Sequence, residues 1–258
     1  MNLAANHYVC PDGYGVERFL DEAVAAGFES IALTRAALAE MSPTGLRRAV
    51  EARELTVTTL SSAGYFTWAE PARRLAQDQE NRALIAAAAE LGAGALCVIT
   101  GGCAEQPSVA LARAHVADGL AELDRLAAAE GVRLGLEPIH PKDIATKGCV
   151  NSIAQAQSLI APLRATGLIL DLFHSWWDPD LIAAAADPSV CVLQICNVTK
   201  DLRRSAVLDQ GVLDVGALVD QIRGTGFAGP VEFEIFAADH GQADIAPILA
   251  AAAAWARA

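Results

Sequence analysis

The sequence has few basic residues, few aromatic residues and no closely spaced pair of cysteines. Its 258 residues include 19 Lys and Arg against 31 Asp and Glu, which gives a net charge of −12 at pH 7. A nucleic-acid groove needs many Lys and Arg to displace counterions from phosphates, so this balance argues against DNA or RNA as a partner. It also argues against an anionic membrane surface. Small substrates that are neutral or carry a carbonyl group fit the composition better.

Targeting signals and a disulfide framework are also missing. The six cysteines form no Cys-x-x-Cys pair, and two of them sit in apolar runs, where cysteine behaves as a small hydrophobe. The start, "MNLAANHYVCPDG", has no basic segment followed by an apolar core, so we expect no signal peptide. No uninterrupted run of about 18 apolar residues occurs, so we expect no transmembrane helix. These absences predict a reduced, cytoplasmic protein.

Short apolar runs typical of strands alternate with longer amphipathic runs typical of helices. The predicted strands are residues 2–6, 30–34, 56–61, 95–100, 132–137, 167–173, 190–197 and 231–236. The predicted helices include residues 16–26, 43–54, 72–91, 109–130 and 215–225. Several of these helices are followed by a glycine, as expected where a helix ends in a left-handed residue.

Eight such alternations over about 250 residues match the size and rhythm of a (β/α)8 TIM barrel, an α/β fold. An open doubly wound sheet is the structural alternative, but it would show a glycine-rich phosphate loop after its first strand. Here the first strand continues into "NHYVCPDG". No linker rich in Pro, Ser or Gly divides the chain, so we predict a single domain, residues 1–258.

Polar residues stand at the ends of the later strands, where the active site of such a barrel lies. Glu137 ends the fifth strand, and Asp171 lies in the sixth with His174 three residues on. Gln194 lies in the seventh strand. The last strand carries both Glu232 and Glu234, which face the same way because they are two residues apart.

Three carboxylates on adjacent strands would converge at one point, where their repulsion calls for a cation. Three carboxylates and an amide are hard oxygen donors, which suit Mg²⁺ or Mn²⁺. For each acid taken alone, a salt bridge or a helix cap is the alternative. His174 taken alone could equally be a core histidine.

Four segments resemble the sugar phosphate isomerase/epimerase group, the xylose isomerase-like TIM barrels: "GLEPIHP", "LILDLFHSWWDPDL", "VLQICNVTKDLRR" and "GFAGPVEFEIF". That superfamily also includes tagatose 3-epimerase, hydroxypyruvate isomerase, inosose and dehydroshikimate dehydratases and AP endonucleases of the endonuclease IV type. The resemblance covers essentially the whole chain and is strongest over residues 135–236.

The resemblance implies a divalent metal, Mn²⁺ or Mg²⁺, with four protein ligands: Glu137, Asp171, Gln194 and Glu234. It selects Glu234 over Glu232. The chain departs from the family pattern at the third ligand, where a His-x-x-Asp segment is usual and Gln194 and Asn197 stand instead. A glutamine amide oxygen binds metal more weakly than imidazole does and cannot act as a base.

The function implied is a metal-dependent isomerase or epimerase of a small ketose or keto-polyol, working through a cis-enediolate. Glu137 and Glu234 would transfer the proton, and His174 would hydrogen-bond the substrate. Lys200, Arg203 and Arg204 follow the seventh strand, and at least one is expected at the barrel mouth, with a solvated loop as the alternative. The expected substrate-binding residues are His140, His174, Trp176, Lys200 and Arg203.

Two other functions stay open from the sequence. The same enediolate could expel a β-hydroxyl, which would make the protein a dehydratase of an inosose or a dehydroshikimate-like keto-polyol. A non-catalytic sugar-binding barrel is the second alternative. The expected partner is a sugar or keto-polyol substrate. A homo-oligomer that pairs through outer helices is also possible from the sequence.

Overall fold

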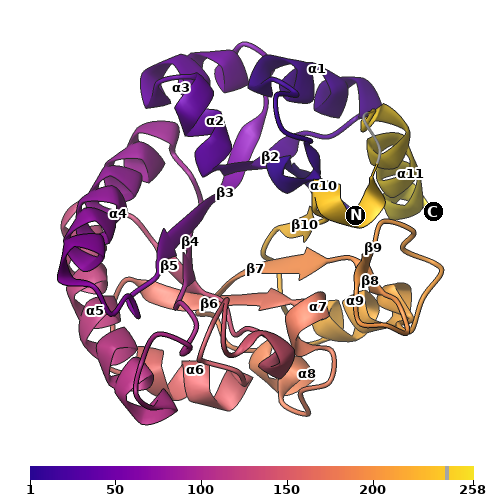
Figure 1. Ribbon diagram of the computed structural model, residues 1–258. Coiled ribbons are helices and arrows are strands. Elements are labelled where there is room, and N and C mark those ends of the chain that lie inside the picture. Colours follow the sequence, from indigo (N-terminus) through magenta and orange to yellow (C-terminus); the bar gives the residue numbers. More distant parts are fainter. Residues whose placement is uncertain (242–243) are drawn as a thin grey trace.

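Eight parallel strands form a closed barrel, and helices surround it as an outer ring (Figure 1). The computed structural model describes residues 1–241 and 244–258. The strand order around the barrel is β1-β10-β7-β6-β5-β4-β3-β2, so successive strands are neighbours and the last pairs with the first. This arrangement confirms the (β/α)8 barrel predicted from the sequence.

The barrel strands are short and buried along nearly their whole length, as expected for a parallel sheet covered by helices. They are β1 (Leu3–Asn6), β2 (Ser30–Thr34), β3 (Thr56–Gly64), β4 (Ala95–Ile99), β5 (Leu134–Leu136), β6 (Thr166–Asp171), β7 (Val190–Ile195) and β10 (Val231–Phe233). A separate two-stranded antiparallel ribbon consists of β8 (Asn197–Val198) and β9 (Arg204–Ser205).

The helices of the ring are rich in alanine, which favours helix and lets them lie close to the strands. They are α1 (Val16–Ala26), α2 (Arg35–Glu40), α3 (Pro43–Glu51), α4 (Pro71–Leu91), α5 (Val109–Ala129), α6 (Ile153–Ile160), α7 (Leu172–Ser175), α8 (Leu181–Ala184), α9 (Val215–Gly224), α10 (Ala237–His240) and α11 (Ala246–Arg257). Short 3-10 turns occur at η1 (His7–Val9) and η2 (Pro141–Asp143). Across the described residues, no helix has both the length and the apolar character needed to cross a membrane.

Six predicted strands extend beyond the observed ones, and most of the extra residues lie at the barrel mouth. The prediction 167–173 is too long because the Asp171 side chain accepts a hydrogen bond from the Phe173 amide (2.8 Å) and begins α7. The prediction 190–197 joins two elements, since β7 ends at Ile195 and Asn197 begins the ribbon. Residues 132–137 and 231–236 contain only three-residue strands, which leaves Glu137 and Glu234 just beyond the strand ends.

Strand register places polar side chains from three neighbouring strands at one level. Gln194 of β7 pairs with Asp171 of β6 on one side and with Glu232 of β10 on the other. Paired residues of a parallel sheet point to the same face, so these three side chains lie together at the C-terminal end of the barrel.

Candidate functional site

The acids predicted from the sequence meet where the strands end. Glu137, Asp171 and Glu234 are buried, with at most 3% of each residue exposed. His174, on α7, lies beside two of them: its Nε2 is 3.6 Å from Glu137 Oε1 and 3.8 Å from Asp171 Oδ2. Together, Glu137, Asp171, His174 and Glu234 are called the acid cluster below.

A buried arginine bridges two carboxylates of the acid cluster. Arg204 Nη2 lies 2.5 Å from Asp171 Oδ2, and Arg204 Nη1 lies 3.3 Å from Asp171 Oδ1. The same Nη2 lies 2.9 Å from Glu234 Oε2, an ion pair without the alignment of a hydrogen bond. Among the three basic residues that follow the seventh strand, the structure therefore brings Arg204 to the acids.

A second positive charge comes from Lys147, which sequence reasoning missed. Its Nζ lies 3.1 Å from His174 Nε2. Lys147 lies in the loop between β5 and α6, ten residues after Glu137, and a lone lysine in a loop has no pattern that could reveal it. The only available signal was its position in the loop that follows a strand ending in an acid.

His174 is held in one orientation by the backbone. The amide N–H of His140 donates to His174 Nδ1 at 3.1 Å, which fixes the ring orientation and turns Nε2 toward the acids and Lys147. Burial lowers the pKa of His174 well below its usual value, and the charges of Lys147 and Arg204 lower it further. His174 is therefore a neutral ring whose Nε2 lies between the acids and Lys147.

Burial also shifts the two glutamates. It raises the pKa of Glu137 to about 7; Lys147 opposes this rise and the charge of Asp171 adds to it. Burial raises the pKa of Glu234 well above its ordinary value, against the opposing charge of Arg204. A carboxyl group with a raised pKa takes up and releases protons closer to neutral pH, which is what a proton-transferring residue requires.

Gln194 is oriented by a carboxylate from inside the barrel. Its Nε2 donates to Glu232 Oε2 (3.0 Å) and to Glu234 Oε1 (3.3 Å). Its Oε1 is buried and has no hydrogen-bond partner among the described residues, and the same holds for Glu137 Oε1. Unpaired buried oxygens of this kind mark places where a ligand can bind.

Glu232 has a different environment from Glu234, although both reach the amide of Gln194. The carboxylate of Glu232 accepts hydrogen bonds from the hydroxyls of Thr58 (2.5 Å) and Thr59 (2.7 Å). It also lies 3.4 Å from Asn6 Nδ2. Glu232 is thus tied to groups within the barrel, whereas Glu234 faces Arg204.

Glu137, Asp171 and His174 could hold a metal ion, because one ligand-type atom of each lies within 4.8 Å of the others. The side chains as arranged do not fit a bound divalent ion. Nε2 of His174 lies 3.1 Å from the Lys147 ammonium, so a metal ion bound there would meet a second positive charge. Both oxygens of Asp171 contact Arg204. The ligand set Glu137, Asp171, Gln194 and Glu234 therefore stays a prediction.

The remaining predicted substrate-binding residues lie around the acid cluster. His140 is partly exposed and packs edge-on against Trp177, with 5.8 Å between ring centres. Trp176 packs against a small apolar group beside the ribbon, and its buried Nε1 has no partner among the described residues. Lys200 and Arg203 are exposed on the ribbon, and Arg203 donates to the Ala238 carbonyl instead of to an acid.

Asn197, at the departure from the His-x-x-Asp pattern, has an architectural role. Its Nδ2 donates to the carbonyls of Leu208 (2.9 Å) and Leu213 (3.0 Å), and its Oδ1 accepts from the amides of Val198 and Leu213. Asn197 thereby holds the loop that follows the ribbon. An aspartate there could not donate these two bonds.

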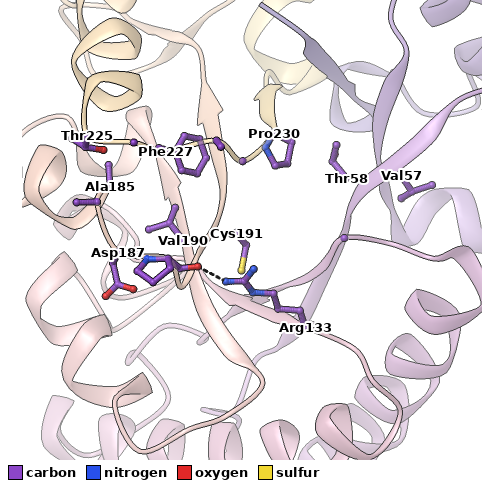
Figure 2. Close-up of a pocket in the computed structure, with 16 residues that line it drawn as sticks. Val57, Thr58, Arg133, Ala185, Asp187, Val190, Cys191, Thr225, Phe227 and Pro230 are labelled. Carbon is purple, nitrogen blue, oxygen red and sulfur yellow. Dashed lines mark hydrogen bonds between the residues drawn. The ribbon is translucent and has the colours of Figure 1, made fainter.

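Hollows lie at both ends of the barrel, but their chemistry differs. At the N-terminal end lies a cavity of about 620 Å³, whose lining residues are drawn in Figure 2. Within it, Arg133 donates a hydrogen bond to the carbonyl of Pro188 (3.0 Å). Its charged lining residues are Arg133 and Asp187. At the C-terminal end, a hollow of about 370 Å³ is lined in part by His7, Tyr8 and Ser61. Tyr8 packs on Phe236, which in turn covers Arg204, so this hollow lies close to the acid cluster.

Comparison with known families agrees with the barrel fold. The profile of the xylose isomerase-like TIM barrel family matches residues 20–258. The chain belongs to this family. No curated protein is similar enough in sequence to count as a relative of this xylose isomerase-like barrel.

Solved structures similar to this xylose isomerase-like barrel span almost the whole chain. A protein from Sinorhizobium meliloti 1021 is 29% identical, with a TM-score of 0.90 over 99% of this chain and 97% of its own. The 3-keto-D-glucoside 4-epimerase from E. coli is 21% identical (TM-score 0.79; 100% of this chain and 99% of its own). The zinc-bound IolI protein is 18% identical (TM-score 0.80; 98% and 96%). At such identities, the last two show the fold alone.

Proposed function

We propose that the protein is an isomerase or epimerase of a small ketose or keto-polyol. It would move a proton next to a carbonyl through a cis-enediolate, with Glu137 and Glu234 as the acid and base. The observation that carries this proposal is the pair of buried glutamates with raised pKa values beside a fixed cation, Arg204. The E. coli keto-glucoside epimerase with the same fold supports keto sugars as the substrates to test first.

Each residue of the acid cluster has a role in this proposal. The ionised glutamate removes the proton from carbon, and the protonated one returns a proton from its own side. His174 hydrogen-bonds the substrate through Nε2, and the free Oε1 of Gln194 accepts a hydrogen bond from a substrate hydroxyl. His140 and Trp176 would border the sugar, while Lys200 and Arg203 would act only from the exposed part of the ribbon.

The developing oxyanion needs a positive charge beside it, because charge that forms in a buried site is not stabilised by water. The Mn²⁺ or Mg²⁺ ion predicted from the sequence would, when bound, polarise the substrate carbonyl. No step above depends on it, because Arg204 and Lys147 already place positive charge at the acid cluster.

The test is turnover of a panel of ketoses and keto-polyols, with and without phosphate, followed by NMR and mass spectrometry. An epimer or isomer of unchanged mass is expected. Glu137→Gln and Glu234→Gln should each lower kcat by about 10²-fold or more. Glu122→Gln is the control, because Glu122 is exposed on an outer helix.

Other outcomes would redirect the assignment. A product that has lost one water would identify a dehydratase. Saturable binding of a sugar without any product would identify a non-catalytic binding barrel. Unchanged kcat in both glutamine variants would overturn the proposed acid–base pair.

A further inference from the structure

The Arg204 side chain is buried and held in place by its neighbours. It lies on β9, where the ribbon pairs Arg204 with Val198, and only 4% of the residue is exposed. Its guanidinium lies between two aromatic rings, 4.5 Å from the ring centre of Phe173 and 5.0 Å from that of Phe236. An arginine stacked on both sides and buried cannot swing freely, so its contacts with the acids are part of the fold.

The guanidinium fills the space between two of the acids that were expected to share a metal. Nη2 alone contacts both Asp171 Oδ2 and Glu234 Oε2, and Nη1 reaches the second oxygen of Asp171. A divalent ion bound to Asp171 Oδ2 would lie about 2.1 Å from that oxygen. It would then be within about 5 Å of Nη2, and the two positive charges would repel each other in a buried site.

Charge and ligand chemistry lead to the same conclusion. Arg204 and Lys147 offset two of the three carboxylates at this point, which removes most of the negative charge that would attract a divalent ion. Gln194 offers an amide oxygen where the family resemblance leads one to expect a histidine, and this weakens the ligand set further. The site therefore lacks the histidine that would bind a metal strongly, and it contains the guanidinium of Arg204 instead.

We propose that the Arg204 guanidinium is the resident cation of this site and takes the place of a divalent metal. The fixed positive charge holds Asp171 and Glu234 together and keeps the folded protein free of bound metal. The catalytic part of this inference rests on the proposed function: Arg204 would stabilise the enediolate oxygen that a metal would otherwise stabilise. The binding part does not depend on any substrate.

The first measurement is the metal content of the purified protein, followed by titration with Mn²⁺ monitored by electron paramagnetic resonance. The unmodified protein should contain well under one equivalent of any divalent metal and should leave added Mn²⁺ free. About one equivalent of tightly held metal per chain would overturn the proposal. Because no substrate is present, a failure of the proposed function would not change this result.

Removal of the guanidinium provides the second measurement. Arg204→Met keeps the length and apolar contacts of the side chain but exposes the oxygens of Asp171 and Glu234 to a metal. Mn²⁺ should then bind at least tenfold more tightly than to the unmodified protein. Arg125→Met is the control, since Arg125 is exposed on an outer helix and its loss should leave Mn²⁺ binding unchanged.

Further outcomes separate the possibilities. Equal Mn²⁺ affinity in Arg204→Met and the unmodified protein would show that Arg204 does not exclude the ion, and would overturn the proposal. If Arg204→Met does not fold, Arg204→Lys keeps the charge and should bind Mn²⁺ no better than the unmodified protein; tighter binding would count against the proposal. Where turnover is found, EDTA should leave the activity of the unmodified protein intact.

Discussion

His7 is a buried histidine outside the acid cluster, and burial lowers its pKa to about 4, although the charge of Glu40 acts in the opposite direction. Its Nδ1 lies 2.8 Å from the hydroxyl of Thr34. In the unfolded chain the same ring takes up a proton near pH 6.5. Stability that is fully present above pH 6.5 is therefore lost as the pH falls to about 4, by about 3 kcal/mol in total.

Urea midpoints measured between pH 7 and pH 4 test this expectation. His7→Asn keeps a polar group near Thr34 but cannot be protonated, so its stability should fall less steeply with acid than that of the unmodified protein. Parallel curves for the two proteins would show that His7 does not drive the acid sensitivity.

The different burial of Arg203 and Arg204 could not be predicted from the sequence. Arg203 and Arg204 are neighbours with the same chemistry, yet Arg203 is exposed and Arg204 is buried among acids. An alternating pattern could have separated them in a long strand, but β9 has only two residues. The acids were found because each ends a long apolar run, a signal that Arg204 and Lys147 lack.

At the scale of elements, the loop after the ribbon depends on one amide. Asn197→Asp would replace the donor that bonds to the carbonyls of Leu208 and Leu213 with an oxygen that repels them. We expect a loss of about 2–4 kcal/mol in the free energy of unfolding, measured by urea denaturation. Gln79→Glu, on the exposed face of α4, should change it by less than about 0.5 kcal/mol. A loss at position 197 as small as that of the control would show that the loop does not need this amide.

Helices and barrel strands were predicted well because their signals are local. The helix predicted at residues 16–26 matches α1, and Gly27 after it has the left-handed φ of 91° that glycine tolerates. The ribbon was missed because its two strands have two residues each and show no periodicity. Its role comes from the antiparallel pairing of Asn197–Val198 with Arg204–Ser205, which no local pattern encodes.

At the scale of the whole molecule, one carboxylate ties the barrel together across its interior. Glu232 of β10 contacts Asn6 of β1, Thr58 and Thr59 of β3, and Gln194 of β7. Glu232→Ala would leave these polar groups buried without partners, so we expect a loss of about 3–5 kcal/mol in unfolding free energy. Glu232→Gln keeps the shape and can still accept from Thr58 and Thr59. Its amide NH2 group would face the donor amides of Gln194 and Asn6, so it should cost about 1–3 kcal/mol, less than Glu232→Ala. Equal losses in the two variants, measured by urea denaturation, would contradict this role.

The barrel itself was predictable because the strand–helix pattern repeats along the whole sequence. Eight strand-like and helix-like alternations support one another, so an error at one boundary does not change the fold. The charge balance of the site was not predictable in the same way. It joins Glu137, Lys147, Asp171, Arg204 and Glu234, and their contacts arise only when the barrel closes.

The burial of the acid cluster has a consequence for hydrogen isotopes. At most 3% of Glu137 and Glu234 is exposed, and the rings of Phe173 and Phe236 flank the arginine between Asp171 and Glu234. A hydrogen taken from a bound sugar would meet almost no bulk water while it resides on a carboxyl group. The hydrogen that reaches the product comes from the other glutamate, so a sugar turned over in heavy water would lose its original label. Each buried carboxyl group would exchange its hydrogen with solvent mainly after the product leaves.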